Sequence, residues 1–237
     1  MENNRSGTLK FAFKKSVPVL FGYIFLGIAF GILLQQAGYN FLWALFISLV
    51  IFAGSMQFVL VSFLSAGTAL PLVALMTFFI NGRHMFYGLS FVDKFKKMGK
   101  MYPYMVFSLT DETYSILCSC EAPEGVDQDK AMFLIALLDQ SYWVLGSVMG
   151  GLIGQMMPFD FAGIEFSMTA LFVVIFLEQW KSFKSHIPAV IGLASAAFFL
   201  ILLGPDKFLL PSLITTSAAI MSCKNRIMMK SGTKEVQ

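Results

Sequence analysis

The chain has 237 residues, of which 57% are hydrophobic and 13% are charged, and its mean hydropathy is +0.73. Soluble domains carry about 25% charged residues, so this composition excludes a water-soluble globular protein and indicates an all-α polytopic membrane protein. The small net charge of +3 excludes a strongly basic nucleic-acid-binding surface.

The N-terminal region predicts a retained membrane helix. Residues 1–16 are polar and basic, and residues 17–35 form an apolar run of spanning length. A secretory signal would instead show a short apolar core followed by a cleavage site of small residues. We therefore expect a cytoplasmic N-terminus over residues 1–16, because basic segments favour the cytoplasmic side.

The rest of the chain predicts seven or eight membrane segments within a single transmembrane domain, residues 17–223. A hydrocarbon core of about 30 Å requires about 20 apolar residues per helix. By that rule the segments lie near residues 17–35, 41–66, 69–92, 102–120, 131–157, 161–180, 187–203 and 207–223. Residues 224–237 are expected to form a cytoplasmic tail.

The second apolar segment, residues 41–66, predicts a break. It is long for one span, and Ala-Gly-Ser-Met-Gln interrupts it at 53–57. The basic loop 93–100 favours the same side as the N-terminus, which requires residues 41–92 to make one net crossing. A broken or re-entrant segment meets that requirement. The alternative is one long tilted helix and a loop that departs from the charge rule.

The sequence also contains pairs of segments with weak internal similarity. Residues 20–35 resemble residues 144–155, and "TALPLVAL" at 68–75 resembles "SHIPAVIGL" at 185–193. The acidic loop 121–130 favours the outside, so the second copy would begin on the side opposite to the first. This pattern predicts inverted repeats, with halves of about 17–120 and 131–223, as in many secondary transporters.

Polar side chains at the end of the third segment are candidates for a site. "NGRHMFYG" at 81–88 places Asn81, His84 and Tyr87 near one helical face, together with Arg83. Ionisable residues inside membrane segments usually face a cavity or a partner. The alternative is that Arg83 extends to the membrane surface and His84 is a packed ring.

Three further positions are candidates for substrate binding or coupling. Asp111 and Glu112 lie in the middle of segment 102–120, unless that segment is a solvated loop. Asp139 begins the polar stretch "DQSYW", which could instead belong to an interfacial aromatic belt. Gln57 follows the break at Gly54 and Ser55, whose exposed backbone groups could bind an ion or a carboxylate.

Four of these stretches resemble the signature blocks of one family. "FAGSMQF" (52–58), "NGRHMFYGLS" (81–90), "LTDETY" (109–114) and "DQSYWVLGSVMGGLIG" (139–154) are similar to those of the AzlC family, the large subunits of bacterial branched-chain amino acid exporters, which include BrnF and YgaZ. The resemblance implies a proton-motive-force-driven exporter of leucine, isoleucine or valine, with methionine as a further substrate. It also implies a small hydrophobic AzlD-like partner subunit in the cytoplasmic membrane.

The residues themselves leave two classes of function open. A zwitterionic aliphatic substrate needs a carboxylate for its ammonium group, a cation or free amides for its carboxylate, and an apolar pocket, and the chain offers all three. A channel or facilitator for another small polar solute is the alternative. An enzyme is not expected, because the sequence lacks HExxH, GxSxG and glycine-rich phosphate-loop motifs. Neither the two histidines nor the three cysteines predict a cofactor or a metal site.

Overall fold

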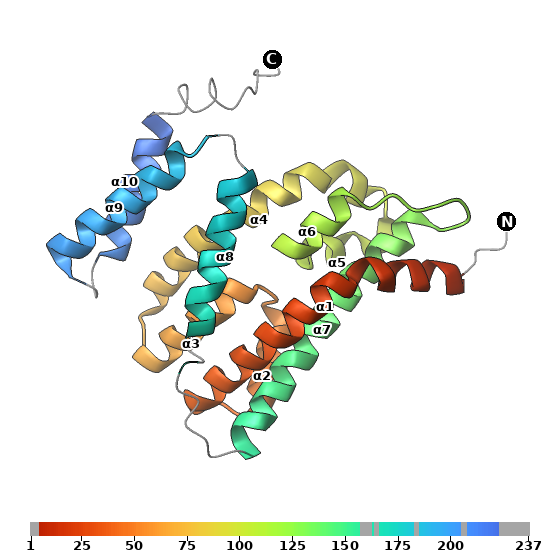
Figure 1. Cartoon of the computed structure of the whole chain (residues 1–237), viewed down its shortest axis with the longest axis horizontal. Coiled ribbons are helices and arrows are strands. Elements are labelled where there is room, and N and C mark those ends of the chain that lie inside the picture. Colours follow the sequence, from red (N-terminus) through yellow and green to blue (C-terminus); the bar gives the residue numbers. More distant parts are fainter. Residues whose placement is uncertain (1–4, 157–162, 164–165, 183–184, 205–207, 223–237) are drawn as a thin grey trace. The chain divides into compact units, whose positions relative to one another are not determined.

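The computed structural model describes residues 5–156, 163, 166–182, 185–204 and 208–222, and the regular elements in this part of the chain are all helices. The chain divides into two units, Met1–Thr169 and Ala170–Gln237. In the first unit the helices are α1 (Arg5–Gln36), α2 (Phe41–Val50), α3 (Gly54–Ala66), α4 (Leu70–Lys96), η1 (Gly99–Met101), α5 (Tyr102–Phe107), α6 (Asp111–Cys118) and α7 (Gln128–Met156) (Figure 1).

The first unit is built on a close pair of long helices, α1 and α7. Glycines on both helices let the two backbones approach: a Cβ atom on Gly27 would lie 2.9 Å from the Ser147 nitrogen, and one on Gly31 would overlap the Ser147 carbonyl oxygen. From the other side, a Cβ atom on Gly150 would overlap the Ile28 carbonyl oxygen. The glycine pattern shared by residues 20–35 and 144–155 therefore marks two helices that pack on each other.

Helices α1 and α7 run in the same direction. Ser16 Oγ in the first half of α1 lies 3.0 Å from Tyr142 Oη in the middle of α7, and Gln35 approaches Gly154 near the ends of the two helices. The loop that precedes α7 therefore lies at the same end as the start of α1. The expectation that the similar segments 20–35 and 144–155 begin on opposite sides is wrong, because it rested on the acidity of loop 121–130 alone.

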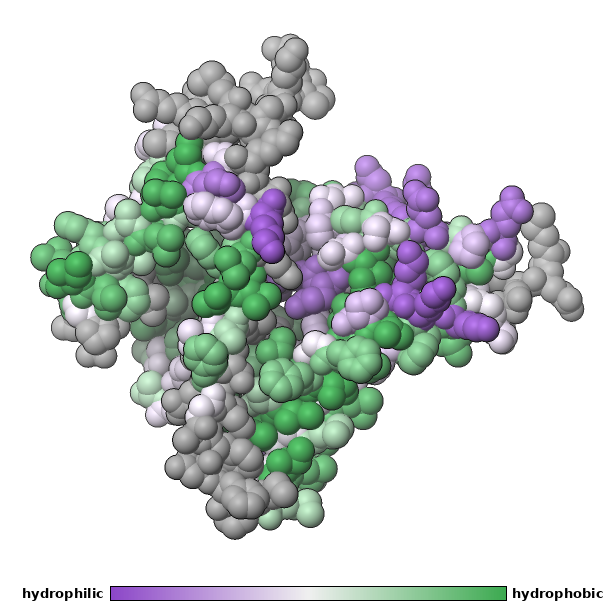
Figure 2. Space-filling view, viewed as in Figure 1, coloured by the Kyte–Doolittle hydropathy of each residue, from purple (hydrophilic) through white to green (hydrophobic). Residues whose placement is uncertain are grey.

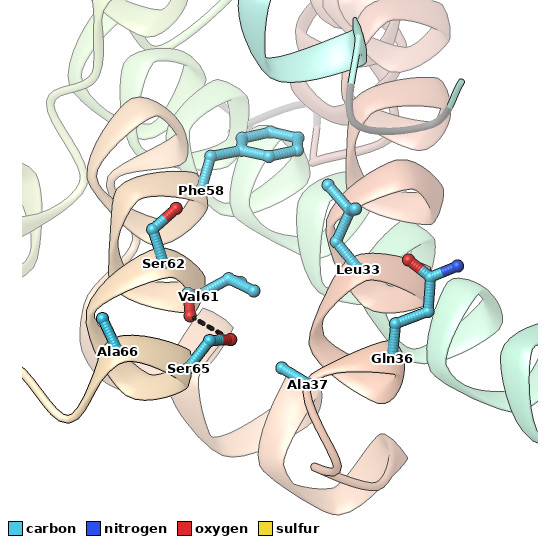
Figure 3. Close-up of a pocket in the computed structure, with 8 residues that line it drawn as sticks. All are labelled: Leu33, Gln36, Ala37, Phe58, Val61, Ser62, Ser65 and Ala66. Carbon is cyan, nitrogen blue, oxygen red and sulfur yellow. Dashed lines mark hydrogen bonds between the residues drawn. The ribbon is translucent and has the colours of Figure 1, made fainter. Parts of the chain in front are cut away.

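Segment 41–66 is broken, as the sequence predicts, and its two halves form a hairpin. Helix α2 ends at Val50 and α3 begins at Gly54. The last residues of α3, Ser65 and Ala66, face Gln36 and Ala37 across a pocket, so the hairpin begins and ends at the C-terminal end of α1 (Figure 3). Its tip points toward the middle of the unit.

Segment 102–120 is also broken, which the sequence analysis did not anticipate. Helix α5 ends at Phe107 and α6 begins at Asp111. Both ends of this second hairpin belong to one buried apolar cluster with the start of α1, the end of α4 and the start of α7. That cluster comprises Ala12, Phe91, Phe95, Met98, Met105, Leu109, Leu117, Cys120, Met132, Ile135 and Ala136. The hairpin α5–α6 thus enters from the N-terminal end of α1, opposite to hairpin α2–α3.

Each hairpin is followed by a long helix, and the two long helices run in opposite directions. Helix α4 ends in the cluster where α7 begins. Residues 41–96 and 102–156 therefore each consist of a hairpin and a long helix, with the second set reversed relative to the first. The bounds of these two inverted sets differ from those of the repeat-like halves expected from the sequence, 17–120 and 131–223. The second of those halves extends into the second unit, so the repeat-like halves stay a prediction.

Two helices among the described residues, Ser6–Gln36 and Gln128–Met156, are long and apolar enough to span a membrane. The prediction of seven or eight segments therefore stays a prediction. Hydrophilic side chains gather over the end of the first unit where α1 begins (Figure 2). Lys10 and Lys14 of α1 are exposed, as are Lys96 and Lys97 at the end of α4. Residues 5–16 belong to helix α1, and the assignment of residues 1–16 to the cytoplasm stays a prediction.

The second unit contains most of α8 (Phe166–Ser182), which begins in the first unit, together with α9 (Ile187–Leu203) and α10 (Leu209–Ser222). Helices α9 and α10 pack on each other, and Ser195 Oγ donates a hydrogen bond of 3.0 Å to the Ser212 carbonyl oxygen. His186 stacks on Trp180 with ring centroids 4.0 Å apart, which is a packing role.

Candidate functional site

The tips of the two hairpins meet beside the middle of α4. Arg83 lies thirteen residues from either end of that helix, which is about 20 Å at 1.5 Å per residue. Its guanidinium group donates to Asp111 from Nε (3.0 Å) and Nη2 (2.8 Å), at the start of α6. Nη2 also donates to Ser55 Oγ at 2.8 Å, at the start of α3. One arginine therefore links both tips.

This position corrects one alternative from the sequence. Arg83 does not extend to a membrane surface, since its side chain is only 21% exposed and is held by Asp111 and Ser55. A bidentate pair of this kind fixes the orientation of both groups as well as their charge. Asp111 and Glu112 have different partners, as expected for neighbours about 100° apart on a helix.

The other polar residues of "NGRHMFYG" lie around this ion pair. His84 Nε2 is 3.9 Å from Asp111 Oδ1, so the imidazole borders the pair without a close hydrogen bond. Tyr87 stacks on Tyr114 of α6 with ring centroids 4.4 Å apart. The side-chain oxygen of Asn81 is buried and has no hydrogen-bond partner in the described structure.

The two tips differ in charge and capping. Helix α3 begins with no side-chain cap and no acidic residue in its first turn. Helix α6 is capped by Thr110, whose Oγ1 accepts from the Thr113 amide at 3.3 Å, and carries Asp111 and Glu112 in its first turn. Because the first amides of a helix lack intrahelical acceptors, the start of α3 offers free donors that favour an anion.

The backbone at the tip of hairpin α2–α3 is strained. Phe52 has φ +34°, the only positive φ of a non-glycine residue in the described chain. Such a conformation costs about 1–3 kcal/mol and persists only where packing enforces it. The Phe52 ring is buried and lies against Tyr23 (6.3 Å between centroids) and Phe107 (6.4 Å). This packing fixes the direction in which α3 leaves the tip.

A second polar chain runs from Glu112 to Asp139 through hydroxyl groups. Tyr23 Oη of α1 donates to Glu112 Oε2 at 2.8 Å and lies 2.6 Å from Thr110 Oγ1. Thr110 Oγ1 lies 3.1 Å from Thr113 Oγ1, which donates to Asp139 Oδ2 at 2.8 Å. Asp139 is fully buried within the first unit.

The remaining candidates support the tip of hairpin α2–α3. Gln57 is fully buried; its Oε1 accepts from the Ala53 amide (3.3 Å) and its Nε2 donates to Ser48 Oγ (3.2 Å). Gln140 Nε2 donates to the Leu49 carbonyl oxygen at 3.3 Å. Gln57 therefore closes the break in the helix and does not contact Arg83. Gly54 faces the Trp143 ring, where a Cβ atom would lie 3.1 Å from it.

Three residues of this second polar chain were missed from the sequence: Tyr23, Thr110 and Thr113. Thr110 carries a recognisable signal, because a threonine followed by two acidic residues is typical of a helix start. Tyr23 gives none, since it stands alone in an apolar run and meets its partners 87 and 89 residues away.

A pocket of about 600 Å³ lies between α1 and α3, between the tips and the C-terminal end of α1 (Figure 3). It is lined by Leu33, Gln36, Ala37, Phe58, Val61, Ser62, Ser65 and Ala66. Phe58 stands at its inner end and packs edge-on against Phe30. Among the residues that the structure describes, no group of three His, Cys, Asp or Glu side chains could hold a metal ion.

Comparison with known proteins places this arrangement in a family. The model of the AzlC protein family matches residues 18–157, which contain both hairpins and all the residues of the site. The chain belongs to the AzlC family. It is 41% identical to the branched-chain amino acid transport protein AzlC of Bacillus subtilis (strain 168), over 86% of this chain and 80% of that protein.

Two further relatives are named as membrane proteins. The chain is 40% identical to an uncharacterized membrane protein of Helicobacter pylori (strain 26695), over 92% of this chain and 96% of that protein. It is 30% identical to the inner membrane protein YgaZ of Escherichia coli (strain K12), over 76% of each. No solved structure matches the chain. The names of the relatives and the apolar helices together identify a helical membrane protein.

The four sequence blocks that resemble the AzlC family coincide with the site. "FAGSMQF" is the tip of hairpin α2–α3, "LTDETY" is the tip of hairpin α5–α6, and "NGRHMFYGLS" is the middle of α4. The block at 139–154 carries Asp139 and the glycines that pack against α1. The blocks therefore describe one three-dimensional constellation.

Proposed function

We propose that this AzlC-family protein is a secondary transporter that exports branched-chain amino acids across the cytoplasmic membrane. The proton-motive force drives it, and a small hydrophobic AzlD-like subunit assists it. The relative from Bacillus subtilis is named for branched-chain amino acid transport. The observation that carries the proposal is that Arg83 contacts two different helix starts. The start of α3 is electropositive and has no side-chain cap, and the start of α6 is acidic.

This junction suits a zwitterion. The substrate carboxylate binds Arg83 and the free amides at the start of α3, beginning at Gly54. The substrate ammonium group binds Asp111 at the start of α6. Both groups lie at about the same depth, because Arg83 already contacts both helix starts. The spacing between the two charges of the substrate is therefore provided by the protein.

Without substrate, Arg83 and Asp111 neutralise each other. A zwitterion can replace each half of this pair, so neither protein charge is left alone when the pair opens. A molecule with only one of the two charges would leave either Arg83 or Asp111 without a partner. Since an unpartnered charge in a desolvated site costs several kcal/mol, the ion pair selects for amino acids.

The apolar side chain of the substrate has space along α3. The pocket between α1 and α3 begins at Phe58, one turn beyond Ser55, and is lined mainly by aliphatic and small residues. Residues three apart on a helix lie on one face, about 5–6 Å apart. A branched aliphatic chain therefore extends from the tip toward Phe58, and the pocket forms the path to the end of α1.

In the membrane, both hairpins are proposed to be re-entrant. Broken backbone survives at membrane depth when it is buried in protein or lines a cavity. The start of α1 and the basic loop 93–100 lie at one end of the first unit, which the charge rule assigns to the cytoplasm. Loop 119–127 lies at this end too, although it is acidic. Acidic residues contribute little to the rule.

Cysteine accessibility tests this orientation. In a variant without its natural cysteines, a cysteine in place of Lys97 or Glu121 is expected to react from the cytoplasm, and one in place of Thr68 from the outside. Labelling of the Glu121 position from outside would contradict the proposed topology.

The channel alternative has one observation in its favour: two hairpin tips that meet in a membrane can also line a pore. The two functions differ in whether movement against a gradient occurs. Uphill efflux of leucine requires a coupled transporter, whereas a channel only equilibrates the solute.

Efflux from preloaded cells tests the proposal. The full-length chain, made with and without a small AzlD-like subunit, is compared with Arg83→Gln, in the presence and absence of a protonophore. We expect saturable export of leucine, isoleucine or valine, abolished by Arg83→Gln and by the protonophore. Movement of these amino acids only down their gradient would favour the channel, and no movement with the subunit present would overturn the proposal.

A further inference from the structure

Five oxygen atoms form a continuous chain between two carboxylates at the hairpin tip. In order they are Glu112 Oε2, Tyr23 Oη, Thr110 Oγ1, Thr113 Oγ1 and Asp139 Oδ2, with successive separations of 2.8, 2.6, 3.1 and 2.8 Å. We call this chain the hydroxyl relay. All four separations lie within hydrogen-bonding distance for oxygen pairs.

The number of protons in the hydroxyl relay is one too few when both carboxylates are ionised. Tyr23 donates its proton to Glu112, and Thr113 donates its proton to Asp139. Only the proton of Thr110 remains, and it must serve two contacts, with Tyr23 and with Thr113. Four hydrogen bonds need four protons, and three hydroxyl groups supply three. A single additional proton on either carboxylate completes the chain.

We propose that the hydroxyl relay holds one exchangeable proton and passes it between Glu112 and Asp139 during transport. When Asp139 carries the proton, each hydroxyl donates toward Glu112; when Glu112 carries it, each donates toward Asp139. During a transfer, one O–H bond breaks and one forms at each of the four hydrogen bonds. Each hydroxyl oxygen passes on one proton as it receives another. The carboxyl group at one end therefore loses a proton and the carboxylate at the other end gains one. This inference rests on the proposed proton-coupled transport.

The two ends of the hydroxyl relay differ in their access to water. Asp139 is fully buried, and its Oδ1 has no hydrogen-bond partner in the described structure. An ionised carboxylate in that position would be poorly satisfied, which favours the protonated form. Glu112 is partly exposed. The hydroxyl relay therefore connects a water-accessible carboxylate with a buried one.

The surrounding charges couple the hydroxyl relay to the substrate site. The charged or titratable groups around it are Asp111, which precedes Glu112 in the chain and contacts Arg83 and His84, and Tyr104, which donates to Gln140 beside Asp139. Residues 41–66 contribute no charged side chain. A zwitterionic substrate that opens the Arg83–Asp111 pair exchanges the guanidinium group at Asp111 for the substrate ammonium group. Because Asp111 precedes Glu112 in the chain, this exchange rearranges the charges beside one end of the hydroxyl relay.

Tyr23→Phe tests the transfer, because it removes one hydroxyl and keeps the ring that packs on Phe52 and Trp143. The matched control is Tyr39→Phe, sixteen residues further along, beyond the end of α1. In proteoliposomes with the full-length chain and its small subunit, we measure leucine exchange without gradients and leucine-dependent proton movement with an internal pH dye. A positioned proton donor contributes about 10² or more to a transfer. We therefore expect Tyr23→Phe to lose proton movement at least about tenfold and to keep leucine exchange within about twofold.

Thr113 provides an independent test with a rescue. Thr113→Val removes the hydroxyl that donates to Asp139, and Thr113→Ser keeps it. We expect proton movement to be lost in the valine variant and retained in the serine variant, with leucine exchange in both. Proton movement at the wild-type rate in Tyr23→Phe and Thr113→Val would overturn the proposal.

An infrared measurement separates failure of the hydroxyl relay from failure of the proposed function. Absence of leucine exchange in the wild type would contradict the transporter and not the relay. The relay predicts one protonated carboxyl group at neutral pH, visible as a carboxylic acid C=O band that shifts in deuterated water. This band should disappear in the double variant Glu112→Gln, Asp139→Asn, in which neither carboxyl group of the hydroxyl relay remains. Its absence from the wild type would contradict the shared proton.

Discussion

Hairpins α2–α3 and α5–α6 have the same plan and opposite electrostatics. Each has a break, after Val50 in one and after Phe107 in the other, and each ends with a second helix that starts at the tip. The start of α3 has neither an acidic residue nor a side-chain cap. The start of α6 has a threonine cap and two carboxylates. Arg83 contacts both starts.

The difference shows how one architecture can provide two complementary charges. Both helix starts carry the partial positive charge of a helix N-terminus. At α6 this charge is compensated within the protein, and the net result is acidic. At α3 it is left for a ligand and is reinforced by Arg83. An amino acid, with its carboxylate toward α3 and its ammonium group toward α6, satisfies both.

The largest effect is expected when the acidic tip loses its charge. Asp111→Asn removes one partner of the bidentate pair with Arg83. Truncating one member of a desolvated charge pair costs about 2–5 kcal/mol, which corresponds to a loss of leucine efflux of about 30-fold or more. Asp93→Asn, at an exposed position on the same end of α4 as the basic loop, is the matched control. Equal efflux in both variants would remove Asp111 from the site.

A second variant makes the two tips alike. Ser55→Asp places a carboxylate at the start of α3, next to Arg83, where the substrate carboxylate is proposed to bind. Ser55→Asn introduces a side chain of the same size without the charge. We expect the aspartate variant to export leucine about tenfold more slowly than the asparagine variant, because a like charge at a binding site costs at least about 1.4 kcal/mol. Similar rates would argue against an anion site at α3.

A smaller effect is expected from the scaffold that holds both tips in place. Gly31→Ala introduces a methyl group against the Ser147 carbonyl oxygen at the crossing of α1 and α7. Overpacking of this kind costs about 1–3 kcal/mol, measured as a lower thermal unfolding temperature in detergent. Gly22→Ala, which has no atom within 4 Å of the new methyl group, should be neutral or stabilising. A Gly31→Ala protein as stable as the wild type would show that the crossing is looser than described.

The sequence predicts one hairpin and misses the other for physical reasons. Gly54 and Ser55 interrupt a long apolar segment with residues that weaken a helix, and the structure is broken next to them. In segment 102–120 the polar residues Thr110, Asp111 and Glu112 suggest costly charges inside a continuous helix. Capping chemistry shows instead that the same residues start a new helix, α6.

The contacts of the site between residues that are far apart in the sequence could not be predicted from sequence patterns. The candidates Arg83, Asp111, Glu112 and Asp139 were identified because ionisable residues stand out in apolar segments. Their pairing depends on the direction of α1 and α7, which local periodicity does not encode. The acidity of loop 121–130 suggested the wrong direction, because charge near a membrane is a weaker constraint than the close packing of glycines on two helices.

The most direct test of the account compares leucine with 3-methylbutylamine, which lacks the carboxylate, as competitors for leucine exchange. The wild type should prefer leucine strongly. Arg83→Lys, which keeps a cation but cannot hold the same bidentate geometry, should lose most of this preference, and Ser55→Asn should lose part of it. If the Arg83→Lys protein discriminates as well as the wild type, the substrate carboxylate does not bind at the junction of the two hairpins, and the central claim is wrong.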